Sequence, residues 1–367
     1  MGRIIRLIIV GLLLLGFVAL VIGGVAFILW GDEIIDFAQT ALIRYSLSSR
    51  QDDLLTPAGF DDSPVRFVIE PGDTPKIIAD RLVSWTLILD GQLFVDYLRA
   101  NELDRQIEAG TYFLYQTQTI PQIALALTDS SNSQFPFRIL EGWRLEEIAT
   151  AIDDNPYFAF SGADFLEVVG ANGLAEPDFT AYAGLPPGAS LEGFLFPDTY
   201  QLPAEITPLM LRDILTQTFR EQVGTQLVTD AAADGFSLYE IVTIASIVQR
   251  EAVHADEHPL IASVYHNRLA NGMKLDADPT VQYAIGYRGG RWWPGISAAE
   301  YTSVISPYNT YLNYGLPPGP ISSPGLSAIR AAAYPAESSY FYFRADCSPD
   351  GYHTFATTYE EHLGNGC

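Results

Sequence analysis

The hydrophobic pattern of the chain begins with one long apolar segment and then changes to short helical and alternating patterns. Residues 7–30 carry no charge, and Leu, Ile, Val and Phe dominate them. As a helix they would extend about 36 Å, at about 1.5 Å per residue, which is enough to cross a bilayer. Arg3 and Arg6 precede the segment, and Asp32 and Glu33 follow it. Under the positive-inside rule this predicts a cytoplasmic N-terminus and a chain that continues outside the membrane.

A cleaved signal peptide is the alternative for this segment. The apolar run is longer than the core of about 7–15 residues that signal peptides use. Small residues at Gly23, Gly24 and Ala26 would nevertheless allow cleavage, and no cysteine lies nearby for lipoprotein anchoring. The pattern favours a transmembrane anchor over residues 1–30, followed by a polar juxtamembrane linker over residues 31–63.

Beyond the linker, a strand, a glycine turn and an amphipathic helix are predicted twice. The matching positions are Phe67, Ile69, Gly72, Ile78 and Ala79, and then Phe137, Ile139, Gly142, Ile148 and Ala149. Asp73 or Thr74 is expected to cap the first of the two helices. Residues 109–115 and 338–346 alternate in the same way and predict further strands.

The first of these copies, FVIEPGDTPKIIADRL from Phe67 onward, resembles the opening of a LysM-type glycan-binding module. The resemblance implies a βααβ module over residues 64–132. The alternative is a small α/β scaffold that makes no contact with sugars. Helical patterns with Pro and Gly punctuation follow, so we expect an α+β fold overall, with a second domain over residues 133–367.

The strongest helical pattern covers residues 238–253, and Ser237 and Glu240 fit a capping box at its start. One face carries four residues at helical spacing: Ile241, Ile244, Val248 and Glu251. Because an apolar face must be buried, the carboxyl of Glu251 should lose hydration and its pKa should rise. A raised pKa is what a general acid needs at neutral pH. The alternative is a structural ion pair of Glu251 with Arg250 or Arg268.

Composition narrows the choice of ligand. The formal net charge is −24, so the surface should repel phosphate backbones, and nucleic acid is not an expected partner. Aromatic residues make up 12% of the chain, which suits stacking on sugars. Cys347 and Cys367 would form a disulfide in an oxidising compartment or remain two unrelated thiols.

Three long motifs resemble those of the MltG (YceG-like) endolytic murein transglycosylases. They are LEGFLFPDTY at residues 191–200, IASIVQREAVHADEHPLIASVYHNRLANGMKLDADPTVQYAIG at 244–286, and SPYNTYLNYGLPPGPISSPG at 306–325. The resemblance implies that Glu251 is the catalytic acid and base. It implies cleavage of the β-1,4 bond between N-acetylmuramic acid and N-acetylglucosamine to give 1,6-anhydro ends, without a cofactor. The family often has an acidic residue where this chain has Gln249.

The same resemblance implies a catalytic domain held outside the bacterial cytoplasmic membrane, acting on nascent glycan strands beside peptidoglycan synthases. Other polar residues of the motifs are expected to line a substrate groove. They are Glu192, Asp198, Tyr200, Asn267, Thr280, Gln282, Tyr308 and Asn309, although each would equally suit a structural hydrogen bond. The pair Asp278-Pro279 is expected to form a turn or to begin a helix.

Two other functions remain open from the sequence. The string from His254 to His258 matches the H-x-x-E-H pattern of a zinc hydrolase. Pro259 argues against a metal there, because the residue before a proline is disfavoured in the α region. A membrane-anchored scaffold that binds peptidoglycan without cutting it is the third possibility. It predicts that a Glu251→Gln protein loses no function.

Overall fold

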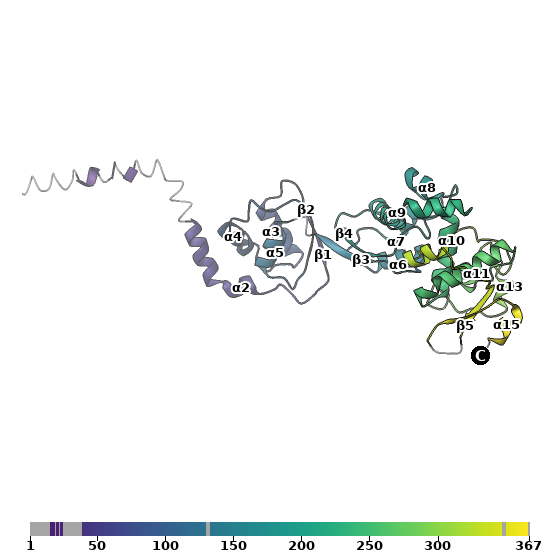
Figure 1. Cartoon of the computed structure of the whole chain (residues 1–367). Coiled ribbons are helices and arrows are strands. Elements are labelled where there is room, and N and C mark those ends of the chain that lie inside the picture. Colours follow the sequence, from purple (N-terminus) through teal and green to yellow (C-terminus); the bar gives the residue numbers. More distant parts are fainter. Residues whose placement is uncertain are drawn as a thin grey trace, which may run out of the picture. The chain divides into compact units, whose positions relative to one another are not determined.

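The chain forms two compact units in a computed structural model that describes residues 15–18, 20–21, 23–24, 39–129, 133–346 and 350–365. The units comprise residues 1–133 and 134–367 (Figure 1). Most of the predicted anchor falls outside the described residues, and its described positions are helical. Within the described ranges, no single helix has the length and apolar composition needed to span a membrane. Two successive helices, Pro208–Ala233 and Leu238–Glu251, meet that test only together and are bent by 102° at their junction.

The first unit pairs two antiparallel strands with several short helices. Its elements in chain order are a helix over 39–49, α2 (Gln51–Leu55), β1 (Val65–Ile69), α3 (Pro75–Ser84), α4 (Gly91–Ala100), β2 (Gly110–Leu114) and α5 (Ile120–Ala126). Phe67 of β1 lies opposite Tyr112 of β2. Both rings are buried in one apolar core, together with side chains of α3, α4 and α5.

The turn between β1 and α3 is built as the sequence predicts. Gly72 has a φ of 95°, a conformation that L side chains rarely adopt. Thr74 is the N-cap of α3, because its side chain accepts a hydrogen bond from the amide of Ile77 at 3.4 Å. Asp73 instead accepts from the amide of Glu70 at 2.8 Å and pairs with Arg81, which ties the turn to α3.

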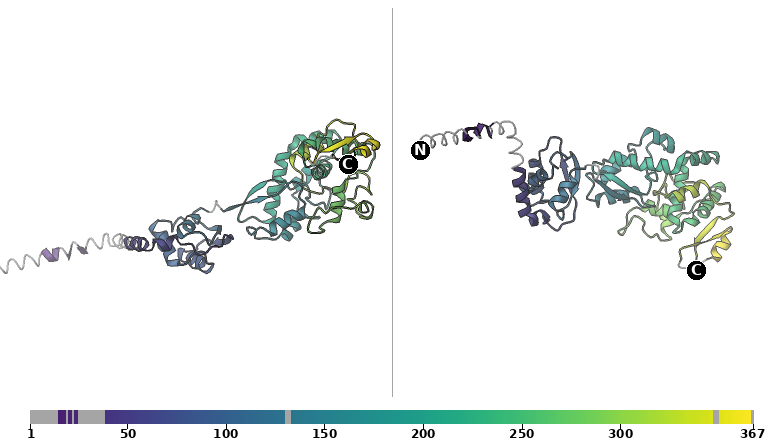
Figure 2. Two further views of the ribbon diagram at one scale, coloured as in Figure 1. Left: turned by 90° about the horizontal axis from the view of Figure 1, so that it is seen from below. Right: turned by 60° about the vertical axis from the view of Figure 1, so that its left-hand side comes forward.

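The second unit is mainly helical, and its described residues form two separate strand pairs (Figures 1 and 2). Its elements in chain order are β3 (Gln134–Arg138), α6 (Leu145–Asp153), α7 (Gly162–Val169), α8 (Pro177–Ala183), β4 (Thr199–Pro203), α9 (Pro208–Ala233), α10 (Leu238–Glu251), η2 (Ala255–Glu257), α11 (His258–Ala270), α12 (Asp278–Ile285), α13 (Glu300–Ser303), α14 (Leu326–Ala333), β5 (Tyr342–Ala345), β6 (His353–Ala356) and α15 (Tyr359–Gly364). β3 pairs with β4, and β5 with β6, both antiparallel. The second predicted strand-turn-helix copy is therefore present as β3 and α6, with a φ of 78° at Gly142.

Helix α10 lies among the other helices of this unit and packs against α11 and α14 (Figure 1). Ser237 and Glu240 form the predicted capping box at its start. Every residue from Ile241 to Val248 is buried, so the helix is covered on all sides and not on one face only. It ends at Glu251, two residues earlier than predicted, because Ala252 is extended with φ −100° and ψ 139°.

The last described segments form what we call the C-terminal cap, consisting of β5, β6 and α15. The strand predicted over 338–346 is shorter, and β5 covers only Tyr342–Ala345. Its preceding residues form a loop, because Asn267 on α11 donates hydrogen bonds to the carbonyls of Ser338 and Tyr340 at 3.0 and 2.9 Å. The cap is thereby fastened to the helices that surround Glu251.

Candidate active site

Glu251 is the last residue of α10, and its side chain is half-buried. Its Oε1 accepts a hydrogen bond of 2.7 Å from the hydroxyl of Tyr265, which lies on α11 and is 1% exposed. The buried helix α10 thus ends in a carboxyl group that is partly accessible to solvent. A hydroxyl from the neighbouring helix sets the orientation of that carboxyl group.

Glu251 opens onto a pocket of about 440 Å³ that lies between the helices and the C-terminal cap. Carboxyl, phenol, guanidinium and imidazole groups dominate the lining, which includes Glu251, Tyr265, Arg268, Asp276, Asp278, Tyr301, Tyr311, Phe343, Arg344, His353 and His362. A pocket with so many hydrogen-bonding groups suits a polyhydroxylated ligand better than an apolar one.

Burial raises the pKa of the Glu251 carboxyl to about 7. The hydrogen bond from Tyr265 acts in the opposite direction, since it stabilises the ionised form, and the negative charge of Asp278 raises the pKa further. The charges of Arg268 and Arg250 lower it by smaller amounts. Near neutral pH the group can therefore both donate a proton and take one back.

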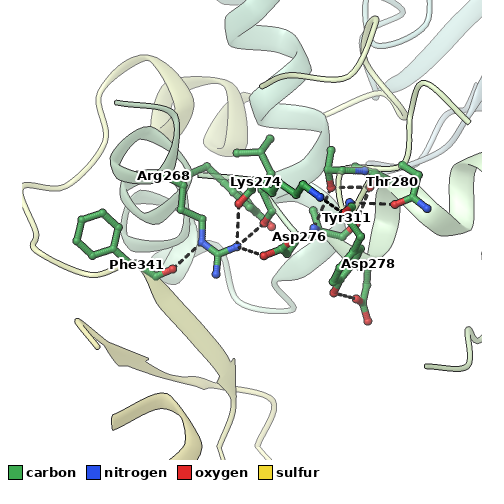
Figure 3. Close-up of polar contacts among 12 residues, drawn as sticks. Arg268, Lys274, Asp276, Asp278, Thr280, Tyr311 and Phe341 are labelled. Carbon is green, nitrogen blue, oxygen red and sulfur yellow. Dashed lines mark hydrogen bonds and ion pairs between the residues drawn. The ribbon is translucent and has the colours of Figure 1, made fainter. Parts of the chain in front are cut away.

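Neither arginine that could have paired with Glu251 does so in the described structure. Arg268 pairs with Asp276 at 3.3 Å and donates to the carbonyls of Phe341 and Leu275 at 2.6 and 2.7 Å (Figure 3). The guanidinium of Arg250 lies over the ring of Trp293, 4.0 Å from its centroid. The structural alternative weighed for Glu251, an ion pair with either residue, is absent here.

Asp278 is a second carboxylate in the pocket, and two tyrosine hydroxyls donate hydrogen bonds to it. Its Oδ1 accepts from the hydroxyl of Tyr311 at 2.5 Å (Figure 3). Its Oδ2 accepts from the hydroxyl of Tyr301 at 3.4 Å. The two rings stack with centroids 4.3 Å apart. Asp278 begins α12, as the sequence predicts, but its place in the pocket was not predicted. Tyr265 was not predicted, and Arg268 was named only as a possible ion-pair partner of Glu251, although their spacing places both on one face of a helix that follows Glu251.

The C-terminal cap is fixed against the helices by buried polar contacts. Both oxygens of Glu257 accept from His353, one from its backbone amide at 2.8 Å and the other at its Nδ1 at 2.9 Å. Arg268 and Asn267 hold the loop that leads into β5. The predicted substrate residue Asn267 thus uses its amide hydrogens on the protein backbone, and it does not line the Glu251 pocket.

Four other predicted groove residues brace the loops around α12 instead of lining this pocket. Thr280 is buried, with its hydroxyl 2.9 Å from that of Thr310. Asn309 is also buried and donates to the carbonyls of Tyr301 and Val304. Gln282 donates to the carbonyl of Pro294 at 2.9 Å, and the ring of Tyr308 packs on that of Tyr283.

The three predicted residues of the 191–200 motif are also absent from the pocket lining. Asp198 is exposed just before β4, where its carboxylate accepts from the amide of Thr199 at 2.7 Å. Tyr200 is buried, and its hydroxyl donates to the carbonyl of Phe196 at 2.6 Å. Glu192 is 2% exposed, and its Oε2 accepts from the amide of Leu145 at 3.3 Å. Contacts of these three with a substrate remain predictions.

Glu192→Gln should flatten the pH dependence of stability. Burial raises the pKa of the Glu192 carboxyl to about 8. A raised folded pKa means that the stabilisation is complete below the unfolded value of 4.5 and is lost as pH rises through about 8. One proton corresponds to about 1.4 kcal/mol per pH unit in that window. Denaturant unfolding between pH 5 and 9 measures the slope, and Glu360→Gln, an exposed control, should keep it. An unchanged slope in Glu192→Gln would show that the carboxyl titrates normally.

The histidines of the H-x-x-E-H string point to different partners. His254 stacks on Tyr352 with centroids 4.1 Å apart, and His258 lies 3.1 Å from the hydroxyl of Ser327 through its Nδ1. No group of three or more metal-binding side chains occurs among the residues that the structure describes. Contrary to the expectation for a residue before proline, His258 adopts the α conformation, with φ −48° and ψ −46°. Pro259 sits in the first turn of α11, where its missing N–H costs no helical hydrogen bond. Cys347 and Cys367 lie outside the described residues.

Tyr265→Phe should raise the pKa of Glu251 above about 7. The lost hydroxyl donates to the ionised carboxyl, and a donor of this kind favours the charged form. The carboxyl carbon of Glu251, followed by NMR in a pH titration, reports the change. Tyr314→Phe is the matched control, since Tyr314 is 72% exposed and does not line the pocket. Equal pKa values in the two variants would mean that the hydroxyl does not act on Glu251.

Comparison with known proteins identifies the family. The model of the YceG-like family matches residues 67–366. The chain belongs to the YceG-like family. A Bacillus subtilis (strain 168) member named endolytic murein transglycosylase is 31% identical over 320 residues, covering 84% of this chain and 86% of that protein. A protein of the same name from Streptococcus pneumoniae serotype 2 is 34% identical over 175 residues, which cover 48% of this chain and 31% of the longer streptococcal protein.

A solved structure of the YceG-like family has a similar fold. The crystal structure of a YceG-like protein from Listeria monocytogenes superposes with a TM-score of 0.54 at 28% identity, covering 82% of this chain and 99% of that one. The family match contains Glu251 and every residue that lines its pocket. The resemblance seen in the three sequence motifs is thus confirmed for the YceG-like family as a whole.

Proposed function

We propose that this chain is an endolytic lytic transglycosylase that cuts the glycan strands of peptidoglycan, with Glu251 as general acid and then general base. The observation that carries the proposal is a carboxyl group with a pKa raised to about 7 at the wall of a polar pocket. The names of the curated relatives in Bacillus and Streptococcus support the same activity and substrate.

The Glu251 carboxyl group would give up one proton in the first step of the reaction and take up one proton in the second. Protonated Glu251 donates to the oxygen of the β-1,4 bond, and the bond from that oxygen to C1 of the muramyl ring breaks. The Glu251 carboxylate then takes the proton from the C6 hydroxyl of the same muramyl ring. At the same time, the oxygen of this hydroxyl group bonds to C1. The product has a 1,6-anhydro end, and no water is consumed. Because the nucleophile belongs to the substrate, the reaction gains the advantage of an intramolecular step.

Other groups of the pocket would support this chemistry. The carboxylate of Asp278 places negative charge near the positive charge that develops on the sugar ring in the transition state. Tyr265 would hold the Glu251 carboxyl in one orientation during both proton transfers. Hydroxyl and guanidinium groups on the remaining walls are available for sugar hydroxyls and acetamido groups.

The N-terminal part of the chain suggests where the reaction takes place. The apolar segment over residues 7–30 would anchor the chain in the cytoplasmic membrane, with the second unit outside. The βααβ order of β1, α3, α4 and β2 supports a LysM-like module that binds the same glycan. An anchored enzyme would meet strands as they leave the peptidoglycan synthases, which are the partners we propose.

Mass spectrometry of purified glycan strands digested with the full chain tests the activity. Anhydro-ended fragments from the wild type, and none from Glu251→Gln, are the expected result. Reducing ends would indicate hydrolysis by water instead of attack by the C6 hydroxyl. Uncut strands with both proteins, together with retained strand binding, would favour the non-catalytic scaffold.

A further inference from the structure

A second pocket of the second unit is rich in aromatic rings. It has a volume of about 700 Å³, and Trp143, Tyr287, Trp292 and Trp293 form much of its wall. It shares no lining residue with the pocket of Glu251. Its lining residues come from two parts of the chain. One part is α6 with Trp143 just before it, and the other is the segment that follows α12. We call it the tryptophan pocket.

A tight turn fixes the segment that carries two of these rings. The amide of Arg288 donates to the carbonyl of Arg291 at 2.9 Å, and Gly289 and Gly290 between them have φ values of 62° and 82°. Two successive positive φ values are typical of a type I′ turn, which glycine adopts without strain. The guanidinium of Arg288 also donates to the carbonyl of Gly295 at 2.6 Å. The segment that carries Trp292 and Trp293 is therefore held in one conformation by hydrogen bonds.

Each tryptophan of this segment is held by polar neighbours. The ring of Trp293 has the guanidinium of Arg250 4.0 Å from its centroid, and its Nε1 donates to Glu147 Oε2 at 2.9 Å. The ring of Trp292 has the guanidinium of Arg144 at 4.9 Å. Cations over one side of the rings fix their planes, while both rings still line the pocket.

We propose that the tryptophan pocket binds a neutral N-acetylated sugar segment of the glycan strand at a distance from the bond that is cut. This inference rests on the proposed function and extends it to a second subsite. Aromatic faces pack against the C–H faces of sugar rings, and the carboxylates of Glu147 and Asp154 can accept hydrogen bonds from hydroxyl and acetamido groups. The net charge of −24 disfavours a polyanionic occupant.

The pocket lies within reach of a strand bound at Glu251. Arg250, which lies over Trp293, directly precedes Glu251 in α10. Helix α12 starts at Asp278 in the Glu251 pocket and ends shortly before Tyr287 in the tryptophan pocket. Its length is about 12 Å at about 1.5 Å per residue. One strand of several sugars can therefore occupy both pockets, which would favour cutting inside a strand over cutting at its end.

Binding of a β-1,4-linked N-acetylglucosamine tetramer tests the inference without any cleavage step. The full chain carrying Glu251→Gln is titrated by calorimetry. A second sample contains 5-fluorotryptophan, so that fluorine NMR reports each ring. We expect Trp292→Ala to weaken binding about tenfold and Tyr287→Ala, at an exposed position, to weaken it severalfold. The signals of Trp292 and Trp293 should shift on binding. Tyr334→Ala removes an exposed ring that lines neither pocket, and as the control it should leave the affinity unchanged.

Unshifted signals of Trp292 and Trp293, or equal affinities in all variants, would overturn the inference. The cleavage assay separates this from a failure of the proposed function. If the wild type makes anhydro ends and Trp292→Ala binds the tetramer with unchanged affinity, the second subsite is refuted and the enzymatic activity is supported. If Trp292→Ala loses affinity and the wild type makes no anhydro ends, the sugar site is supported and the enzymatic activity is refuted.

Discussion

Glu251→Gln should lower the rate of strand cleavage by about a factor of 10²–10⁴, the usual contribution of a general acid and base. The amide has nearly the shape of the protonated carboxyl that burial favours at neutral pH, so the fold should be retained. Release of anhydro-ended fragments from purified strands, followed over time, measures the loss. Glu240→Gln makes the same chemical change at the other end of α10, where glutamine also suits a capping box, and should keep the wild-type rate. Similar rates for the two variants would remove Glu251 from the chemistry.

The pH profile of the wild type gives a second readout of the same group. Because the reaction begins with a protonated carboxyl whose pKa is about 7, kcat/KM should fall about tenfold per pH unit above that value. An ordinary glutamate would place the fall near pH 4.5. A profile that is flat between pH 6 and 9 would therefore contradict the assignment of Glu251 as the acid.

Arg268→Leu should lower the free energy of unfolding of the second unit by about 3 kcal/mol, since it leaves buried carbonyl groups without donors. Arg268 is 8% exposed and donates to the carbonyls of Phe341, Lys274 and Leu275 (Figure 3). Its loss should also release the C-terminal cap from α11 and reduce strand cleavage. Denaturant unfolding measures the first effect, and hydrogen exchange of the β5 amides measures the second.

Arg138→Leu is the matched control for Arg268→Leu, because it removes an exposed arginine from β3. It should change the unfolding free energy by no more than about 0.5 kcal/mol and leave exchange in β5 unchanged. If Arg268→Leu behaved in the same way, the hydrogen bonds of its guanidinium would not be what fastens the cap.

Local structure around Glu251 could be predicted because it depends on short-range patterns. The capping box of Ser237 and Glu240 and the apolar spacing that leads to Glu251 both involve residues within one helix. The proline after Asp278 similarly marks the start of α12. Such signals lie within a few positions of the feature they predict, so a single sequence is enough to find them.

The long-range contacts that hold the C-terminal cap beside the Glu251 pocket could not be predicted in the same way. The contact between Glu257 and His353 joins positions 96 residues apart, and no periodic pattern links them. Residue type also does not tell whether a polar group serves the protein or a ligand. Thr280 and Asn309 belong to motifs of the family, yet their hydrogen bonds go to neighbouring loops of the chain.

The position of the C-terminal cap makes the Glu251 pocket sensitive to local unfolding. Phe343, Arg344, His353 and His362 form part of the pocket wall, and all four lie in the cap. Local opening of the cap would leave the carboxyl group of Glu251 in place and remove part of the enclosure around it. The integrity of the pocket therefore depends on the stability of the cap as well as on that of the helices.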